Sequence, residues 1–294
     1  MCSLVRSSFG GPQTRVWGVG GRAAAWHSAS MRRRTLLGGL ALGALGLALP
    51  RSARAAGPLR VGLYQAAGVH PVAFAAEKAL LERSAGFRCT VLTPTEVSRG
   101  GLAQQDVAVF MGGSGTAQGR ALGDAGKQAV KDFVRGGGGY VGVCAGAYLA
   151  LQGEDEFHKL RLVAGRNLTG DAWQRGIAGL EVEAAGRPRF KLFYANGPIF
   201  TPVPTEGLAP YQSLASYVGE IFSLAKGTGP GEMPGTPAIV ASAYGDGRVL
   251  LFSPNPVLGG DGVLHPELML AGLRWSATRG AVAGPLGFAD VFAA

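Results

Sequence analysis

The segment Gly139–Gly146 constrains the fold more than any other, because it places a cysteine between two glycines directly after an apolar run. Its centre reads Gly142-Val143-Cys144-Ala145-Gly146. A sharp turn from a strand into a helix brings backbone against backbone, and glycine on each side of the turn avoids a clash. The pattern predicts a nucleophile elbow, with Cys144 at the carboxyl end of a strand and a helix starting near Ala145.

A cysteine at such an elbow is expected to be reactive. The N-terminus of the following helix favours a thiolate, which predicts a pKa for Cys144 below that of a free thiol. The alternative is a small buried hydrophobic residue, which is what free cysteines usually are. Cys89 lies in an apolar run and is expected in the core, so we expect no disulfide bond between the two cysteines.

The positive net charge comes from the first 55 residues, which hold eight of the 28 Lys and Arg residues and no Asp or Glu. Residues 56–294 carry 20 basic and 19 acidic side chains, and this balance argues against nucleic-acid binding. Residues 31–55 combine a basic segment, the apolar run Leu36–Leu49 and small residues before Ala56, which predicts a secretory signal. The pair Arg33-Arg34 makes this signal similar to a twin-arginine leader.

Residues 1–30 precede Met31 without sustained periodicity, and we interpret them as an over-extended gene start. The apolar run Leu36–Leu49 is shorter than the roughly 20 residues of a transmembrane helix. We therefore expect no stable membrane span after signal cleavage, and a periplasmic or extracellular location. Residues 56–294 are long enough for one domain with a proper core.

Short apolar runs alternate with helical stretches along residues 56–294, which predicts a single α/β domain with a doubly wound, mostly parallel sheet of flavodoxin-like type. The expected strands are Leu59–Tyr64, Phe87–Leu92, Val107–Met111, Tyr140–Val143, Arg189–Phe193, Ala238–Ala243 and Val249–Phe252. The expected helices are Pro71–Ser84, Ala121–Arg135 and Pro266–Thr278, and Gly227–Pro237 is expected to be a surface loop.

Ligands of such sheets bind outside the carboxyl ends of the strands. Three segments should meet there: the loop Gln65–His70, the glycine-rich turn Gly112–Gly115, and the elbow at Cys144. Backbone amides of Gly112, Gly113 and Ala145 would then form an oxyanion hole beside the cysteine.

The arrangement resembles the class I glutamine amidotransferase-like superfamily, and more closely the domain at the N-terminus of some biotin-protein ligases. The resemblance covers roughly Leu59–Trp275, and it implies that fold, with Cys144 as nucleophile and a pocket lined by Tyr194, Asn196, Gly197 and Asn255. A ligase domain is not seen, so biotin attachment is not implied. The segments that carry the resemblance are Phe110–Gly113, Gly136–Gly139, the elbow, Arg120-Ala121-Leu122, Gly146-Ala147-Tyr148, Tyr194–Phe200 and Gly245–Leu250.

The chain departs from the superfamily pattern after the last strand, where a His-Pro-Glu is replaced by Asn255-Pro256-Val257. Asparagine can hydrogen-bond a thiol but cannot take its proton at neutral pH. Loss of a positioned base costs about 10²–10⁴-fold in rate. His265 and His70 are candidate substitute bases, although His265 also fits a helix start and His70 a solvated loop. His158 lies in a charged run and is expected at the surface.

Two functions from different classes remain open. The first is an exported hydrolase that cleaves a C–N bond of a small amide or peptide through a thioester on Cys144. The second is a catalytically inactive relative that keeps the crevice as a binding site for a small ligand or a protein. No motif calls for a cofactor, and no C-x-x-C or H-E-x-x-H spacing suggests a metal. The sequence does not indicate the oligomeric state.

The twin-arginine reading makes a direct prediction about export. Replacing Arg33 and Arg34 together with Lys should leave the precursor uncleaved in the cytoplasm, because this export route reads the arginine pair. Fractionation and N-terminal sequencing measure the outcome. Unchanged processing to an N-terminus near Ala56 would contradict it.

Overall fold

The computed structural model describes residues 57–153, 155–168, 175–223, 229–260, 262–280, 282 and 284–293. They belong to one compact unit, Ala53–Ala294. The expected leader, residues 1–55, lies outside the described residues, as do residues 227 and 228 of the expected surface loop. Among the described helices, none combines the length and the hydropathy that crossing a membrane requires.

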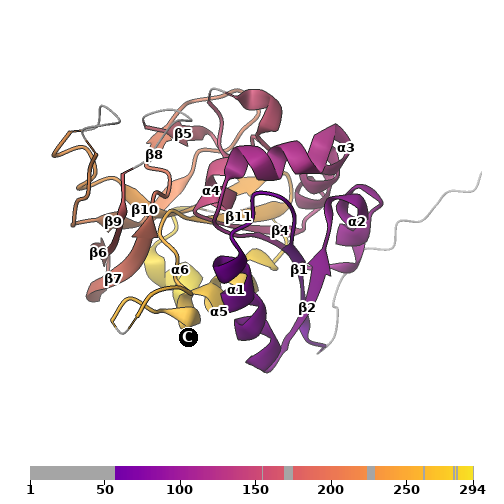
Figure 1. Ribbon diagram of the computed structural model, residues 1–294, viewed down its shortest axis with the longest axis horizontal. Coiled ribbons are helices and arrows are strands. Elements are labelled where there is room, and N and C mark those ends of the chain that lie inside the picture. The colour runs from indigo at the N-terminus through magenta and orange to yellow at the C-terminus, as the bar shows by residue number, and fades with distance from the viewer. Residues whose placement is uncertain are drawn as a thin grey trace, which may run out of the picture. The chain divides into compact units, whose positions relative to one another are not determined.

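A nine-stranded mixed sheet forms the centre of the fold (Figure 1). Its spatial order is β2-β1-β3-β4-β11-β10-β9-β6-β7. The five strands from β2 to β11 are parallel, and the remaining strands continue the sheet in antiparallel pairs. The strands are β1 Leu59–Tyr64, β2 Phe87–Leu92, β3 Val107–Phe110, β4 Gly139–Val143, β6 Ile177–Ala184, β7 Arg187–Ala195, β9 Gln212–Tyr217, β10 Pro237–Tyr244 and β11 Gly247–Phe252.

Helices cover both faces of the sheet, so the predicted doubly wound α/β fold is confirmed. Two hydrophobic clusters, one on each side, form the core. The first involves α1 (Pro71–Arg83), α5 (Pro266–Ser276) and α6 (Phe288–Phe292). The second involves α2 (Pro94–Ser98), the 3-10 helix η1 (Gly101–Gln104), α3 (Gly115–Arg135) and α4 (Ala145–Ala150).

The central strands are apolar along their whole length, because helices cover both faces of the sheet. Every residue of β3 and of β4 is buried. Parallel strands under helices on both faces read as continuous hydrophobic runs rather than alternating ones. This is why the sequence located these two strands to within one residue.

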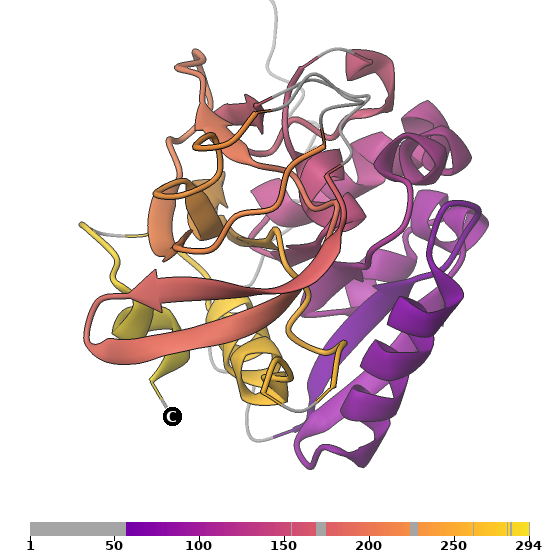
Figure 2. The same cartoon turned by 60° about the vertical axis from the view of Figure 1, so that its left-hand side comes forward.

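The antiparallel half of the sheet was predicted less completely. Strand β6 was not expected, although Leu180 and Val182 alternate with Glu181 and Glu183 as in a half-buried strand. The β6–β7 pair extends past α5 and α6 (Figure 2), where the Phe190 ring packs edge-on against Phe288. A short two-stranded sheet, β5 (Gly165–Asn167) with β8 (Phe200–Pro202), and the 3-10 helix η2 (Glu156–His158) were also not predicted.

The helix expected over Ala121–Arg135 begins earlier, at Gly115. The Ser114 side chain caps it by accepting a hydrogen bond from the Ala117 N–H at 3.3 Å. A break at Gly123, where φ is 61°, separates this first part from the predicted one. The glycine-rich sequence hid the first part, because glycine is a poor helix former.

Helix α1 carries a buried carboxyl group, that of Glu77. Glu77 is fully buried in the described structure, and neither of its carboxyl oxygens has a hydrogen-bond partner among the described residues. Burial raises the pKa of Glu77 from 4.5 to about 8, because the charged form loses its hydration. The Glu77 side chain is therefore neutral at pH 7.

This carboxyl makes stability depend on pH. The folded pKa lies above the unfolded value, so the folded state holds the proton between about pH 4.5 and 8 and its stability falls as pH rises through that window. The loss is about 1.4 kcal/mol per pH unit. We predict that Glu77→Gln flattens this slope in urea unfolding measured from pH 5 to pH 9. Glu82→Gln, an exposed position on the same helix, is the matched control. An unchanged slope in Glu77→Gln would contradict the assignment.

Candidate active site

The three predicted loop segments meet at the carboxyl edge of the sheet. Strands β1 and β3 are neighbours, and the His70 N–H donates to the Gly112 carbonyl at 2.8 Å while the Ser114 N–H donates to the Gly68 carbonyl at 2.7 Å. Strand β4 lies beside β3 in register, which brings Cys144 next to the same turn. The expectation that these segments form one crevice is confirmed.

The turn at Cys144 is strained. Its φ is 52° and its ψ is −105°, a backbone conformation that side chains rarely adopt. Such a residue costs about 1–3 kcal/mol and persists only where its surroundings hold it. A Cβ on Gly142 would lie 2.6 Å from the Gly146 carbonyl oxygen, and one on Gly146 would run into the Phe110 carbonyl. The two glycines are therefore required by backbone contact, as predicted.

Backbone groups surround the thiol. The Cys144 Sγ donates a hydrogen bond to the Ala195 carbonyl oxygen at 3.3 Å. The backbone N–H groups of Gly113 and Ala145 donate hydrogen bonds to the sulfur. Gly112 also lies beside the sulfur, since a Cβ built on it would make an ordinary contact with Sγ at 3.8 Å. The amides that hydrogen-bond to the sulfur are those of Gly113 and Ala145, so the expected amide contribution of Gly112 is not seen.

The predicted low pKa of Cys144 is wrong. Burial raises the pKa of this thiol above 9.0 and outweighs the two amides, which lower it. Helix α4 has only six residues, so little dipole is available to offset the lost hydration. Burial also raises the pKa of Cys89, to about 11. The resting sulfur of Cys144 is therefore a thiol that donates its hydrogen.

Two cavities meet at Cys144 and share Gly113, Cys144 and Asn196. The larger has a volume of about 780 Å³ and the smaller about 190 Å³. The other residues of the larger cavity are His70, Val72, Ala73, Gly112, Ile177, Phe193, Ala195, Asn255, Leu258 and Gly259. The other residues of the smaller cavity are Ser114, Gly115, Thr116, Ala145, Tyr148 and Pro198.

Of the histidines in the described residues, His70 is the one that lines a cavity of Cys144. His265 lines neither cavity: its Nδ1 lies 2.8 Å from the Glu267 carboxylate, and its ring packs edge-on against Phe190. The hypothesis that His265 replaces the missing base is therefore not supported. His158 lies 3.5 Å from Asp155, also away from the cavities.

The residues predicted to line the pocket divide into two groups. Asn196 and Asn255 line the cavities. Tyr194 and Gly197 do not, because Tyr194 is fully buried and donates its hydroxyl to the Gly197 carbonyl at 2.9 Å. That part of the prediction is wrong. The sequence analysis missed the apolar residues that line the larger cavity. It also missed most of the polar residues that line the smaller one, where only Ser114, within the predicted glycine-rich turn, was indicated by the sequence.

Position 255 faces the cysteine cavity but is held by backbone contacts. The Asn255 N–H donates to the Phe193 carbonyl at 2.7 Å, and the Asn255 Oδ1 accepts from the Val257 N–H at 2.8 Å. The Asn255 side chain is therefore held by its hydrogen bond to the backbone of the turn that begins at this residue. It holds the loop in place and provides no proton acceptor for Cys144.

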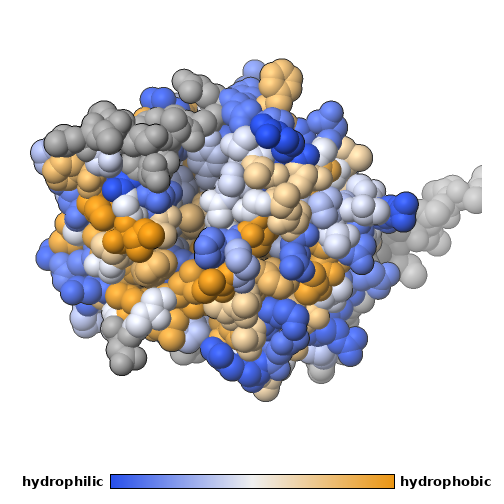
Figure 3. Space-filling model, in the orientation of Figure 1, coloured by the Kyte–Doolittle hydropathy of each residue, from blue (hydrophilic) through white to orange (hydrophobic). Residues whose placement is uncertain are grey.

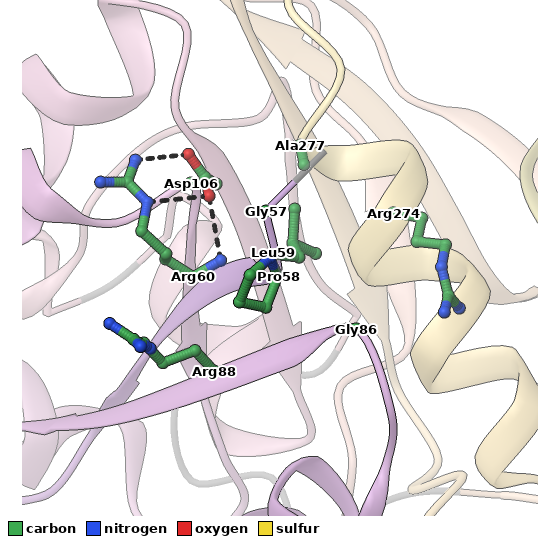
Figure 4. A pocket seen from close by; sticks show the side chains of 9 residues that line it. All are labelled: Gly57, Pro58, Leu59, Arg60, Gly86, Arg88, Asp106, Arg274 and Ala277. Atoms are coloured by element: carbon green, nitrogen blue, oxygen red, sulfur yellow. Dashed lines mark hydrogen bonds and ion pairs between the residues drawn. The ribbon is translucent and has the colours of Figure 1, made fainter. Parts of the chain in front are cut away.

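A further cavity of about 520 Å³ lies at the opposite, amino edge of the sheet (Figure 4). Arg60 and Asp106 form an ion pair in its wall, with Nη2 and Oδ1 2.6 Å apart. None of the predicted site residues lies there. Within the described residues, no group of His, Cys, Asp and Glu side chains could hold a metal ion.

Comparison with known proteins agrees with the resemblance seen in the sequence. Residues 102–169 match the family "Biotin-protein ligase, N terminal". This segment begins in η1, includes β3 and the glycine turn, and continues beyond α4, so it contains the elbow. No curated protein matches the chain.

Several solved structures are similar to the chain. A glutamine amidotransferase is 22% identical over 69% of this chain and 93% of its own, with a TM-score of 0.48. A ThuA-like protein from Parabacteroides merdae is 15% identical over 78% of this chain and 93% of its own, with a TM-score of 0.47. The PurLQS structure from Thermotoga maritima is 13% identical over 68% of this chain and 88% of its own, also at 0.47.

The geometry of position 255 gives a prediction about the thiol. We expect Asn255→His to lower the raised pKa of Cys144, because position 255 lines the larger cavity together with the sulfur and an imidazole there can take the thiol proton. The pH dependence of iodoacetamide labelling at Cys144, followed by mass spectrometry with Cys89 as internal reference, measures the pKa.

Asn255→Gln is the matched control, since it places no base in the cavity. The wild-type profile at Cys144 should still rise above pH 9, because the protonated thiol does not react. An identical profile in wild type and Asn255→His would show that position 255 does not act on the sulfur.

Proposed function

We propose that the protein hydrolyses a C–N bond of a small amide or peptide through a thioester on Cys144. One observation carries the proposal: a strained cysteine is held with the amides of Gly113 and Ala145 directed at its sulfur. Strain of this kind gathers at functional sites, since a packing residue gains nothing from it. Amides fixed in advance are the donors that stabilise the oxyanion of acyl transfer.

The reaction begins when the thiol proton of Cys144 passes to His70. The sulfur attacks the carbonyl carbon, and the negative charge on oxygen is stabilised by the amides of Gly113 and Ala145. The C–N bond breaks, and His70 returns the proton to the departing amine. Water then adds to the thioester, which releases the carboxylic acid and restores the thiol.

His70 is assigned as the base because it lines the larger cavity together with Cys144. His70 is exposed. Its backbone N–H donates a hydrogen bond to the Gly112 carbonyl, which fixes the start of α1 beside the glycine turn. Catalytic hydrogen bonds are often long in ligand-free enzymes and shorten when substrate binds. An exposed imidazole can make that movement.

A second candidate function is ligand binding without turnover. The commitment of Asn255 to the Val257 amide favours it, because the superfamily's base position contributes no base here. The raised pKa of Cys144 also leaves a neutral thiol at rest. Under this reading the crevice holds a small ligand or a protein segment.

We also propose that the protein is exported, on the leader expected at residues 31–55. The charge balance of residues 56–294 suits a partner that is a small molecule or peptide rather than nucleic acid.

The hydrolase proposal predicts a covalent intermediate. Incubation of the full chain with 4-nitroacetanilide should release 4-nitroaniline and add one acetyl group to Cys144, detected by mass spectrometry of peptides. The rate should rise with pH, because burial holds the pKa of the thiol above 9.0 and the thiolate is the nucleophile. His70→Asn should lower the rate of acetylation by about 10²-fold or more.

Cys89→Ser is the matched control and should leave the reaction unchanged, whereas Cys144→Ser should abolish thioester formation. If no acetyl group reaches Cys144 at any pH from 6 to 10, the hydrolase proposal fails and the binding function takes its place. If His70→Asn acylates at the wild-type rate, His70 is not the base.

A further inference from the structure

The two cavities beside Cys144 differ in chemistry as well as in size. Side chains that carry hydroxyl or amide groups line the smaller one, namely Ser114, Thr116, Tyr148 and Asn196. The larger one is mainly apolar, and its volume is about four times greater. Among the residues that the structure describes, no Asp, Glu, Lys or Arg lines either cavity.

The rim of the larger cavity exposes hydrophobic side chains. Val72 is 59% exposed and Ile177 is 66% exposed, and they are two of the five large hydrophobic residues exposed in the described part of the chain. The space-filling view shows hydrophobic residues gathered on the face between α1 and the β6–β7 pair (Figure 3). Val72 comes from α1 and Ile177 from β6, so the two elements present apolar groups to one cavity.

The positions of the proposed catalytic groups indicate which part of the substrate enters each cavity. Ala145, which supplies an oxyanion amide, lines only the smaller cavity, whereas His70 lines only the larger one. His70 must reach the departing nitrogen to return its proton. The amine part of the substrate therefore extends into the larger cavity, and the acyl part occupies the smaller one.

We propose that the substrate joins a short acyl group to a bulky, uncharged, apolar amine. This inference rests on the proposed hydrolase function. The smaller cavity limits the acyl group to a few heavy atoms and offers it hydroxyl and amide partners. The larger cavity removes apolar surface of the amine from water, which is the main source of binding energy for such a group.

The same lining argues against free glutamine as the substrate. Its acyl part carries an ammonium and a carboxylate, and both would enter a cavity of about 190 Å³ in which none of the described lining residues is charged. Burying an unpaired charge is strongly unfavourable. Its amine part is only ammonia, which leaves the larger cavity unused.

Two isomeric amides test the direction. N-hexylacetamide carries its chain on nitrogen, and N-ethylhexanamide carries it on the acyl side, so the pair has equal composition. Each buried methylene is worth about fourfold in binding, so we expect kcat/KM of the full chain for N-hexylacetamide to exceed that for N-ethylhexanamide at least tenfold. Acetamide and L-glutamine are the further arms, and glutamine should react no faster than acetamide.

Substitutions on the rim locate the effect. Ile177→Asp and Val72→Asp should each reduce the preference for N-hexylacetamide severalfold, because a carboxylate on the rim weakens binding of an apolar chain. Phe157→Asp is the matched control: Phe157 is 84% exposed and lines neither cavity, so the preference should stay as in wild type. Circular dichroism confirms that each variant is folded.

The outcomes separate the inference from the function on which it rests. If none of the amides acylates Cys144, the hydrolase proposal fails and the substrate assignment with it. If amides acylate Cys144, the hydrolase proposal stands. The substrate assignment is then overturned by any of three results: the two isomers react equally, N-ethylhexanamide is preferred, or glutamine is the best substrate. A preference that the two rim substitutions leave unchanged also overturns it.

Discussion

The direct backbone contact between the first turn of α4 and the strands beneath it fixes the site. Gly142 and Gly146 leave no room for a Cβ, since the carbonyls of Gly146 and Phe110 occupy that space. The contact holds Cys144 at its positive φ, and the residue lines both cavities. Strand β3 ends at the same level, so the glycine turn that follows it reaches the sulfur as well. The position of Cys144 beside the amides of Gly113 and Ala145 follows from this approach.

Burial and the backbone amides act on Cys144 in opposite directions, and burial is the larger effect. A site of this kind keeps a neutral thiol at rest and needs an acceptor for its proton when substrate arrives. His70 can serve because the loop between β1 and α1 is hydrogen-bonded to the glycine turn. In the proposed reaction, His70 takes the role of the base that position 255 does not supply, and the amides of Gly113 and Ala145 act as the oxyanion donors.

The sequence predicted the parallel half of the sheet and the elbow closely, because buried parallel strands and glycines at a tight turn leave local patterns. It predicted the antiparallel half poorly, since β6 and β9 mix polar and small residues with few apolar ones. The placement of His70 and Cys144 at one cavity followed from topology. The separation of His265 from the cysteine and the apolar rim at Ile177 depend on where the β6–β7 pair packs, which no local pattern encodes. The raised thiol pKa depends on how far the folded chain removes the sulfur from water, which is also not visible in sequence.

The central claim is that Cys144 attacks a carbonyl whose oxygen is received by the amides of Gly113 and Ala145. A crystal structure of the protein with propanal tests it most directly, because the thiol adds to the aldehyde and forms a thiohemiacetal that mimics the tetrahedral intermediate. We expect a bond from Cys144 Sγ to the aldehyde carbon, with the oxygen within about 2.7–3.1 Å of both amide nitrogens. An unmodified Cys144 at saturating aldehyde, or an adduct whose oxygen points away from both amides, would contradict it.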